Sequence, residues 1–183
     1  MTAAEAYELT TQGGTTDFAR VVAACEASGS WCLIGGLAVN AYVEPVYTLD
    51  ADLVVISSGL RGLAEILQAQ GFTIEEHEHS LNARGPGSDL RIQVTTDTRY
   101  QVFPDRSVEA MVLGIPVRVA CLEDVVQGKL WAYGDPRRPL EQTEGRLSKR
   151  KNDELDLIRL AEAWPELRPC TRANSSNRST AAD

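Results

Sequence analysis

The chain has 183 residues, of which 43% are hydrophobic and 24% are charged. This length predicts one domain with a core of its own, and the composition excludes a collagen, a coiled coil and a wholly disordered chain. The 18 Lys and Arg residues against 26 Asp and Glu residues give a net charge of −8. Such an acidic protein is not expected to bind duplex nucleic acid through a broad basic face, although a local basic patch stays open.

The sequence predicts a cytoplasmic protein without a membrane partner. No apolar run approaches the roughly 18 residues of a membrane span, and the polar N-terminus lacks the apolar segment of a signal peptide. The four cysteines show no C-x-x-C spacing, and Cys25 and Cys32 stand in apolar contexts. Both are expected to be buried thiols in a reducing compartment.

Apolar periodicity and turn residues predict helices and strands that intermingle along the chain. The first helix is capped by Thr16, ends at Gly29 and carries an apolar stripe of Phe18, Val21, Val22 and Cys25. After it we expect a strand over 31–34, a short helix over 37–43, a strand over 49–56, a helix over 60–70, strands over 72–76 and 90–96, a hairpin over 108–113 and 115–120, and helices over 122–133 and 148–164. This order predicts an α/β (α+β) fold with a mixed sheet.

The domain organisation follows from the same pattern. Residues 1–15 are expected to be a flexible N-terminus and residues 16–165 to form the domain. Residues 166–183 are small and polar and are expected to be a disordered tail.

A glycine pair and an aspartate pair form the first candidate site. Gly35 and Gly36 follow an apolar strand, and a glycine turn that opens a helix lets backbone N–H groups approach a phosphate. Asp50 and Asp52 lie on one face of the next strand, because strand side chains alternate. Two adjacent carboxylates repel each other unless a cation lies between them, and Mg²⁺ is a cation that carboxylates and substrate phosphates hold together. The alternative is a solvated strand end beside an ordinary turn.

Lys129 is a second candidate. It stands on the apolar stripe of its helix, where a lysine needs an anion or a path to water for its ammonium group. A triphosphate, Asp50 or Asp52 would supply the anion, and snorkelling to solvent is the alternative.

A basic segment over 137–151 precedes the last helix and could serve phosphate or nucleic acid. On that helix Lys149, Asp153 and Asp156 share a face. The alternative to a functional role is a solvated helix face with one ion pair. The opposite, buried stripe is expected to hold Leu157, Ile158, Ala161 and Trp164. His77 and His79 stand among glutamates, and a solvated strand edge is favoured there over a metal site.

These motifs, in this order, resemble the nucleotidyltransferase superfamily, and within it the AbiEii-type nucleotidyltransferase toxins. The resemblance covers about residues 31–165. It rests on the segment 34–39 (IGGLAV), the segment 47–55 (YTLDADLVV), the lysine helix segment 123–132 (EDVVQGKLWA) and the segment 149–157 (KRKNDELDL).

The resemblance implies a nucleotidyltransferase-like mixed sheet flanked by helices, with a C-terminal helical segment. Asp50 and Asp52 would hold magnesium, Gly35 and Gly36 would line the nucleotide phosphates, and Lys129 would touch the phosphate tail. Lys149, Asp153 and Asp156 would belong to the nucleotide site, where either aspartate positions the tail or the lysine. The implied reaction moves a nucleoside monophosphate from an NTP to a hydroxyl of RNA or protein, in a toxin with a possible antitoxin partner.

The sequence departs from the family pattern at two positions. A third carboxylate is common on a central strand, and Gln93 stands there, while Asn152 stands where a lysine is usual. Asp89 is about 13 Å from position 93 along the strand, and Asp97 lies past the strand. Two hypotheses therefore compete: an active magnesium-dependent nucleotidyltransferase, and a degenerate domain that binds a nucleotide or a protein without turnover.

Overall fold

The computed structural model describes residues 5, 7–9, 12–46, 48–134 and 144–167, and for residues 144–149 the backbone only. The chain divides into two compact units, Met1–Cys121 and Leu122–Asp183, where the sequence predicts one domain over 16–165. The tail beyond residue 167, and residues 1–4, 6 and 10–11 of the predicted flexible N-terminus, lie outside the described residues.

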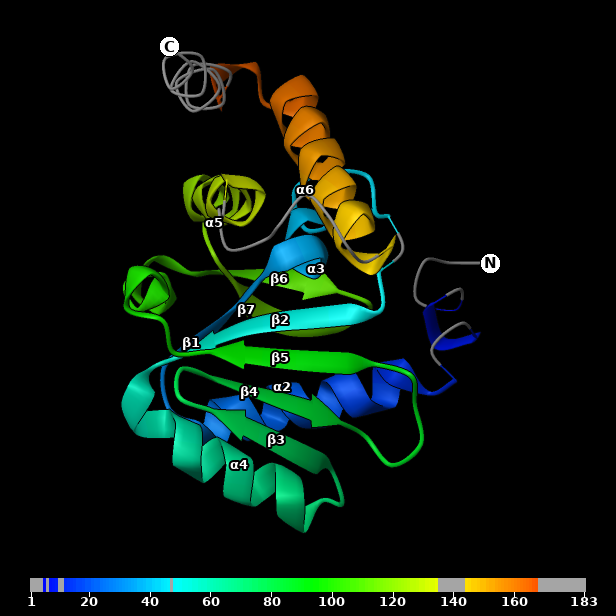
Figure 1. The fold of residues 1–183 in the computed structure, drawn as a ribbon, viewed down its shortest axis with the longest axis vertical. Helices are drawn as coiled ribbons and strands as arrows, with labels where there is room; N and C mark the ends of the chain where they lie inside the picture. Colours follow the sequence, from blue (N-terminus) through cyan, green and yellow to red (C-terminus); the bar gives the residue numbers. More distant parts are fainter. Residues whose placement is uncertain (1–4, 6, 10–11, 47, 135–143, 168–183) are drawn as a thin grey trace. The chain divides into compact units, whose positions relative to one another are not determined.

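The first unit is built on a seven-stranded mixed sheet in the order β3-β4-β5-β2-β1-β7-β6 (Figure 1). The strands are β1 Trp31–Ile34, β2 Asp50–Val55, β3 Thr73–His77, β4 Ser80–Arg84, β5 Arg91–Thr95, β6 Val108–Val112 and β7 Ile115–Val119. Strand β1 pairs antiparallel with β2 and parallel with β7, while β2 pairs parallel with β5. The predicted α/β class with a mixed sheet is confirmed.

Strand β4 is the element that the sequence pattern does not predict. It forms an antiparallel hairpin with β3 and also pairs with β5, so it occupies the place between them. The hairpin β6–β7 was expected from Gly114, and this glycine has the positive φ of 78° that its turn requires.

The helices of the first unit are α2 Gly14–Ser28, α3 Gly35–Val39 and α4 Leu60–Ala69. Helix α2 buries its predicted stripe of Phe18, Val21, Val22 and Cys25. The predicted cap at Thr16 is wrong, because the helix begins at Gly14 after Gly13, whose φ of 105° sets the start of the helix without a side-chain cap. Helix α4 packs on α2 and on β3 and β4, and thus covers apolar sheet residues.

The two faces of the central strands differ sharply in polarity. Along β2 and β5 every second side chain is buried, including Ala51, Leu53, Ile92 and Val94. The opposite face carries polar residues where β2 begins and along β5, whereas the later position Val54 on this face of β2 is apolar and fully buried. The core therefore covers one face of these strands along their length, while polar side chains gather on the other face where β2 begins.

The second unit consists of α5 Leu122–Gly134, α6 Glu144–Ala163 and the short 3₁₀ helix η4 Pro165–Leu167. Helices α5 and α6 pack on each other. The predicted buried stripe of α6 is wrong in part, because Ile158 is 49% exposed and Trp164 is 36% exposed. The buried stripe holds Asp153, Asp156, Leu157 and Leu160 instead.

None of the helices in the described part of the chain combines the length and the apolar character that a membrane crossing requires.

Candidate active site

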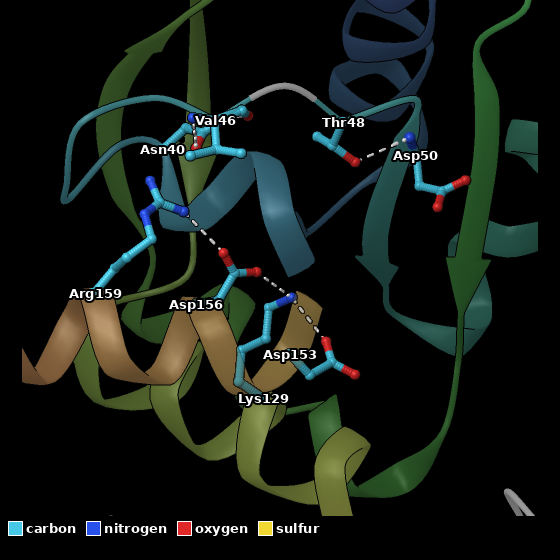
Figure 2. Close-up of polar contacts among 8 residues, drawn as sticks. All are labelled: Asn40, Val46, Thr48, Asp50, Lys129, Asp153, Asp156 and Arg159. Carbon is cyan, nitrogen blue, oxygen red and sulfur yellow. Dashed lines mark hydrogen bonds and ion pairs between the residues drawn. The ribbon is translucent and has the colours of Figure 1, made fainter. Parts of the chain in front are cut away.

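Asp50 and Asp52 lie on the same, polar face of β2, as the strand alternation predicts. Both side chains are partly exposed, while Ala51 between them is fully buried on the opposite face. The backbone N–H of Asp50 donates to the hydroxyl of Thr48 at 3.2 Å, which fixes the entry of the strand (Figure 2). Two carboxylates are thus presented side by side from a rigid element of the sheet.

Gly35 leaves the space that the carboxylate of Asp52 occupies. Its neighbour Ile34 pairs with Asp52 across β1 and β2, so the chain turns into α3 directly beside that side chain. Gly35 has a φ of +71°, and a Cβ built on it would lie 2.9 Å from the Cβ and Cγ atoms of Asp52 and closer still to its Oδ2. A larger residue at position 35 would therefore displace the carboxylate, a reason for this glycine that the sequence pattern alone does not reveal.

Gly36 is less constrained than Gly35. A Cβ on it would meet the side chain of Thr48 at 3.6 Å, which is ordinary contact. The loop between α3 and β2 is held by Asn40, whose side chain donates to the carbonyl of Val46 at 2.8 Å and accepts from its N–H at 2.9 Å (Figure 2). The hydroxyl of Tyr42 donates to the carbonyl of Ala120 at 2.7 Å and ties this loop to the end of β7.

Arg91 is a residue of this site that the sequence analysis missed. It lies beside Asp50 in the parallel register of β2 and β5, and its Nε forms an ion pair with a carboxylate oxygen of Asp50 at 2.7 Å. The Arg91 side chain is 51% exposed, so the pair stabilises the fold by at most about 1 kcal/mol. Its importance is electrostatic, because a guanidinium neutralises part of the charge of the two aspartates.

Gln93 lies beside Asp52 in the same register and is exposed on the same face of the sheet. The prediction that position 93 faces the aspartates is thereby confirmed. The other two acids near the strand are engaged elsewhere: Asp89 accepts from the side chain of Gln12, and Asp97 pairs with Arg99 at 2.8 Å. On β2 and β5, the carboxylates that share the face of Gln93 are the pair Asp50 and Asp52.

The donor set of Asp50 and Asp52 fits a magnesium ion that keeps other oxygen ligands. Mg²⁺ is usually held by one or two carboxylates together with substrate phosphates and water, rather than by an all-protein cage. Among the described residues, no group of three or more His, Cys, Asp or Glu side chains is arranged to hold a metal ion. Two carboxylates and a neighbouring amide are therefore what the protein offers here.

Lys129 and its partners form a buried charge cluster in the second unit. The Lys129 ammonium donates to Asp153 at 2.9 Å and lies 2.7 Å from Asp156, and Arg159 donates to the other oxygen of Asp156 at 2.9 Å (Figure 2). Lys129, Asp153 and Asp156 are 7%, 8% and 9% exposed. Two cations and two anions thus balance within this cluster.

The lysine stays charged in this cluster. Burial lowers the pKa of Lys129, and the charges and hydrogen bonds of Asp153 and Asp156 outweigh it and raise the pKa above its ordinary 10.5. Two carboxylates of the lysine's own unit supply its anions, and the alternative of snorkelling to solvent is wrong because the Lys129 side chain is buried. The alternative of a solvated face for Asp153 and Asp156 is also wrong, because both aspartates are buried.

The predicted site residues are thus distributed over both units. The first unit brings together Gly35, Gly36, Asp50 and Asp52, and the second brings together Lys129, Asp153 and Asp156. The side chain of Lys149 and the basic residues 137–148 lie outside the described side chains.

The histidines and cysteines form no part of this site. His77 is on the edge strand β3, 3.5 Å from Glu75, and His79 is 3.6 Å from Glu78, with all four side chains exposed. Cys25 and Cys32 are buried, and burial, helped by Glu26, raises the pKa of Cys25 to about 12. Cys170 lies outside the described residues.

Comparison with solved structures identifies the fold. A solution structure of the antibiotic-resistance factor ANT(2'')-Ia matches with a TM-score of 0.58 at 18% identity, over 92% of this chain and 98% of that chain. A crystal structure of ANT(2'')-Ia in complex with adenylyl-2''-tobramycin matches with a TM-score of 0.54 at 18% identity, over 84% of this chain and 98% of that chain. No family model matches the sequence, and no curated protein matches it. The fold is nucleotidyltransferase-like, as predicted, whereas nothing in these matches supports the AbiEii type.

Proposed function

We propose that this protein is a nucleotidyltransferase, which transfers a nucleoside monophosphate from a magnesium-bound NTP to a hydroxyl group and releases pyrophosphate. The observation that carries the proposal is the pair Asp50 and Asp52 on one sheet face, with Gly35 leaving room for the second carboxylate. The likeness to ANT(2'')-Ia supports it at the level of the fold.

In this reaction each residue of the first unit has a separate task. Asp50 and Asp52 would hold magnesium, which when bound neutralises charge on the phosphates. Gly35 and Gly36 would let the backbone approach the phosphate chain, as the family resemblance implies. Most of the rate gain in such a transfer comes from positioning and charge neutralisation, so a rigid central strand suits the task.

Gln93 limits how the acceptor hydroxyl is activated. Its amide lies beside Asp52 and can hydrogen-bond the hydroxyl, but an amide does not take up a proton at neutral pH. In our proposal Asp52 or water receives that proton, and the reaction is slower than with a third carboxylate. General-base assistance of this kind typically raises the reaction rate by about 10²–10⁴-fold.

Further parts of the proposal rest on the family resemblance. Lys129, with Asp153 and Asp156 to position it, and Lys149 would contact the phosphate tail. The acceptor would be RNA or protein, the setting a cytoplasmic toxin, and the partner an antitoxin protein. The buried, charge-balanced cluster of Lys129 supports a positioning role for the two aspartates.

A second candidate function is nucleotide binding without turnover. The exposed Gln93 beside Asp52 favours it, because this position then lacks both a metal ligand and a base. The two candidates share the metal and nucleotide site and differ only in product formation.

Label transfer tests the proposal. Each of the four NTPs, labelled at the α-phosphate, is incubated with Mg²⁺, the protein and total RNA or total cell protein. We expect label to appear in one fraction and to disappear with Asp50→Asn or Asp52→Asn. Asp105→Asn, at an exposed aspartate of the same unit, is the matched control and keeps the activity.

Two other results have defined meanings. Magnesium-dependent NTP binding without label transfer to RNA or protein would refute these two acceptors and favour the second candidate. A protein that binds no NTP in the presence of Mg²⁺, or whose binding survives both substitutions, would refute the site itself.

A further inference from the structure

The polar sheet face that carries Asp50 becomes basic on the neighbouring strands. Arg91 on β5 lies beside Asp50, and Arg84 on β4 lies beside Arg91. Residues that pair across adjacent strands point to the same face, so Arg84, Arg91 and Asp50 form one row across the sheet. Both arginines are exposed.

This row places two like charges directly opposite each other. Directly paired residues of antiparallel strands have Cβ atoms about 4.5–5.5 Å apart, and like charges at that distance destabilise the pair. Arg91 is partly neutralised by Asp50 at 2.7 Å. Arg84 has no ion-pair partner among the residues that the structure describes. An anion between the two guanidinium groups would remove the repulsion.

The surroundings of the row suit a phosphate group. The next level of the same face is formed by the uncharged amides of Asn82 and Gln93. The Asn82 amide lies 3.3 Å from the ring of His77, and Glu75 pairs with Asn82 on its other side, so the Gln93 amide is the donor nearest to the row. The guanidinium fork matches phosphate oxygens in a bidentate geometry, which a single ammonium group cannot do.

Magnesium binding would make Arg91 available. Asp50 is the carboxylate that the proposed function assigns to the metal, and a carboxylate that ligates a cation attracts a guanidinium less strongly. We propose that Arg84 and Arg91 form a subsite for a phosphate group beside the two aspartates, and that Arg91 moves from Asp50 to this phosphate when magnesium binds. The inference rests on the proposed function, because it takes Asp50 as a metal ligand.

The phosphate has two possible sources, the triphosphate of the donor and a phosphate of the acceptor. Calorimetric titration in the presence of Mg²⁺ separates them with two probes, tripolyphosphate for the donor and a 5′-phosphorylated ribodinucleotide for the acceptor. We expect Arg84→Gln to weaken one probe by about tenfold or more, since charge-assisted hydrogen bonds to phosphate are lost. Arg61→Gln is the matched control, because Arg61 is 92% exposed and pairs with Glu65 at 3.1 Å on α4. It is expected to change neither affinity.

Arg91→Gln distinguishes the proposed exchange of Arg91 from a general loss of positive charge, because it should change phosphate binding and metal binding in opposite directions. The same phosphate probe should bind more weakly, yet the metal alone should bind several-fold more tightly, because Asp50 loses its competing cation. Electron paramagnetic resonance with Mn²⁺ in place of Mg²⁺ measures the second quantity. Unchanged or weaker Mn²⁺ binding would overturn the exchange of Arg91.

The outcome for the subsite is separable from the outcome for the proposed function. If Asp52→Asn removes metal binding while Arg84→Gln and Arg91→Gln bind both probes as the parent does, only the subsite is refuted. If Asp52→Asn leaves metal binding intact, the proposed function fails irrespective of the arginine variants. A parent protein that binds neither probe also refutes the subsite.

Discussion

Replacing Lys129 by Met should destabilise the second unit strongly, although Met suits an apolar helix stripe. The ammonium lies 2.9 Å from Asp153 and 2.7 Å from Asp156, and both aspartates are less than one tenth exposed. Met leaves two buried carboxylates beside each other, with Arg159 as the remaining cation. Removal of one partner from a buried ion pair costs about 3–5 kcal/mol, because the other charge stays buried without compensation.

The expected loss is large enough to read in a simple assay. For chains of this size 1 kcal/mol shifts the melting temperature by about 2–4 °C, so the substitution should lower it by roughly 6–20 °C. Circular dichroism gives the melting curve, and hydrogen exchange of the α5 and α6 amides shows whether the loss lies in the second unit. Lys151→Met, at an exposed lysine of α6, is the matched control and should change little.

A triple variant separates charge from packing. Lys129→Met combined with Asp153→Asn and Asp156→Asn removes the uncompensated charges and should recover most of the lost stability. Two results would refute the reasoning. One is a loss below about 1 kcal/mol for Lys129→Met, the value of a surface pair. The other is a triple variant that is no more stable than the single one.

Three further changes test the site and the cluster. Gln93→Asp should destabilise the metal-free protein, since a third acid joins Asp52, and should enlarge the thermal shift caused by Mg²⁺ and NTP; an unchanged shift would exclude position 93 from the site. Gly35→Ala should cost at least about 1–2 kcal/mol for the left-handed backbone and should abolish magnesium-dependent NTP binding, whereas Gly62→Ala in α4, where a Cβ meets nothing, should stabilise slightly in urea unfolding. Because the folded pKa of Lys129 is above 10.5, its stabilisation is fully present below pH 10.5 and is lost as the pH rises through the folded pKa; the stability difference between the parent and Lys129→Met should therefore shrink only above that pH.

The sequence predicts the central strands well because their own residues and the adjacent turn residues show that they are buried. Trp31–Ile34 is an apolar run that ends at a glycine pair, Asp50–Val55 is rich in β-formers and is followed by serines and a glycine, and both become strands of the core. Strand β4 has the sequence SLNAR, with few β-formers, and follows β3 after Glu78 and His79, which are not residues typical of a hairpin turn. Strand β4 is stabilised by pairing with β5 as well as with β3, and the periodicity of its own five residues does not reveal this pairing.

The buried face of α6 shows a different limit. Periodicity assigns aspartates to the solvent side of a helix. For α6 considered without α5, it therefore predicts that the face of Asp153 and Asp156 is exposed, whereas this face is buried. Lys129 on the apolar stripe of α5 was the signal of a buried charge. Matching it with two acids spaced i and i+3 on the next helix would have found the cluster, because these positions lie on one helix face.

The neighbours of the two aspartates depend on strand pairing between distant segments. Strand β2 pairs with β1 on one side and with β5 on the other, and this parallel pairing places Arg91 beside Asp50 and Gln93 beside Asp52. A shift of the register by one residue would place apolar side chains there instead. The five residues of β5 therefore determine two things: which side chain neutralises Asp50, and whether a proton acceptor stands beside Asp52. In the proposed function, a cation at the first position and a neutral amide at the second leave magnesium to the two aspartates. We therefore expect a single substitution at position 93 to change turnover while metal binding by the two aspartates is kept.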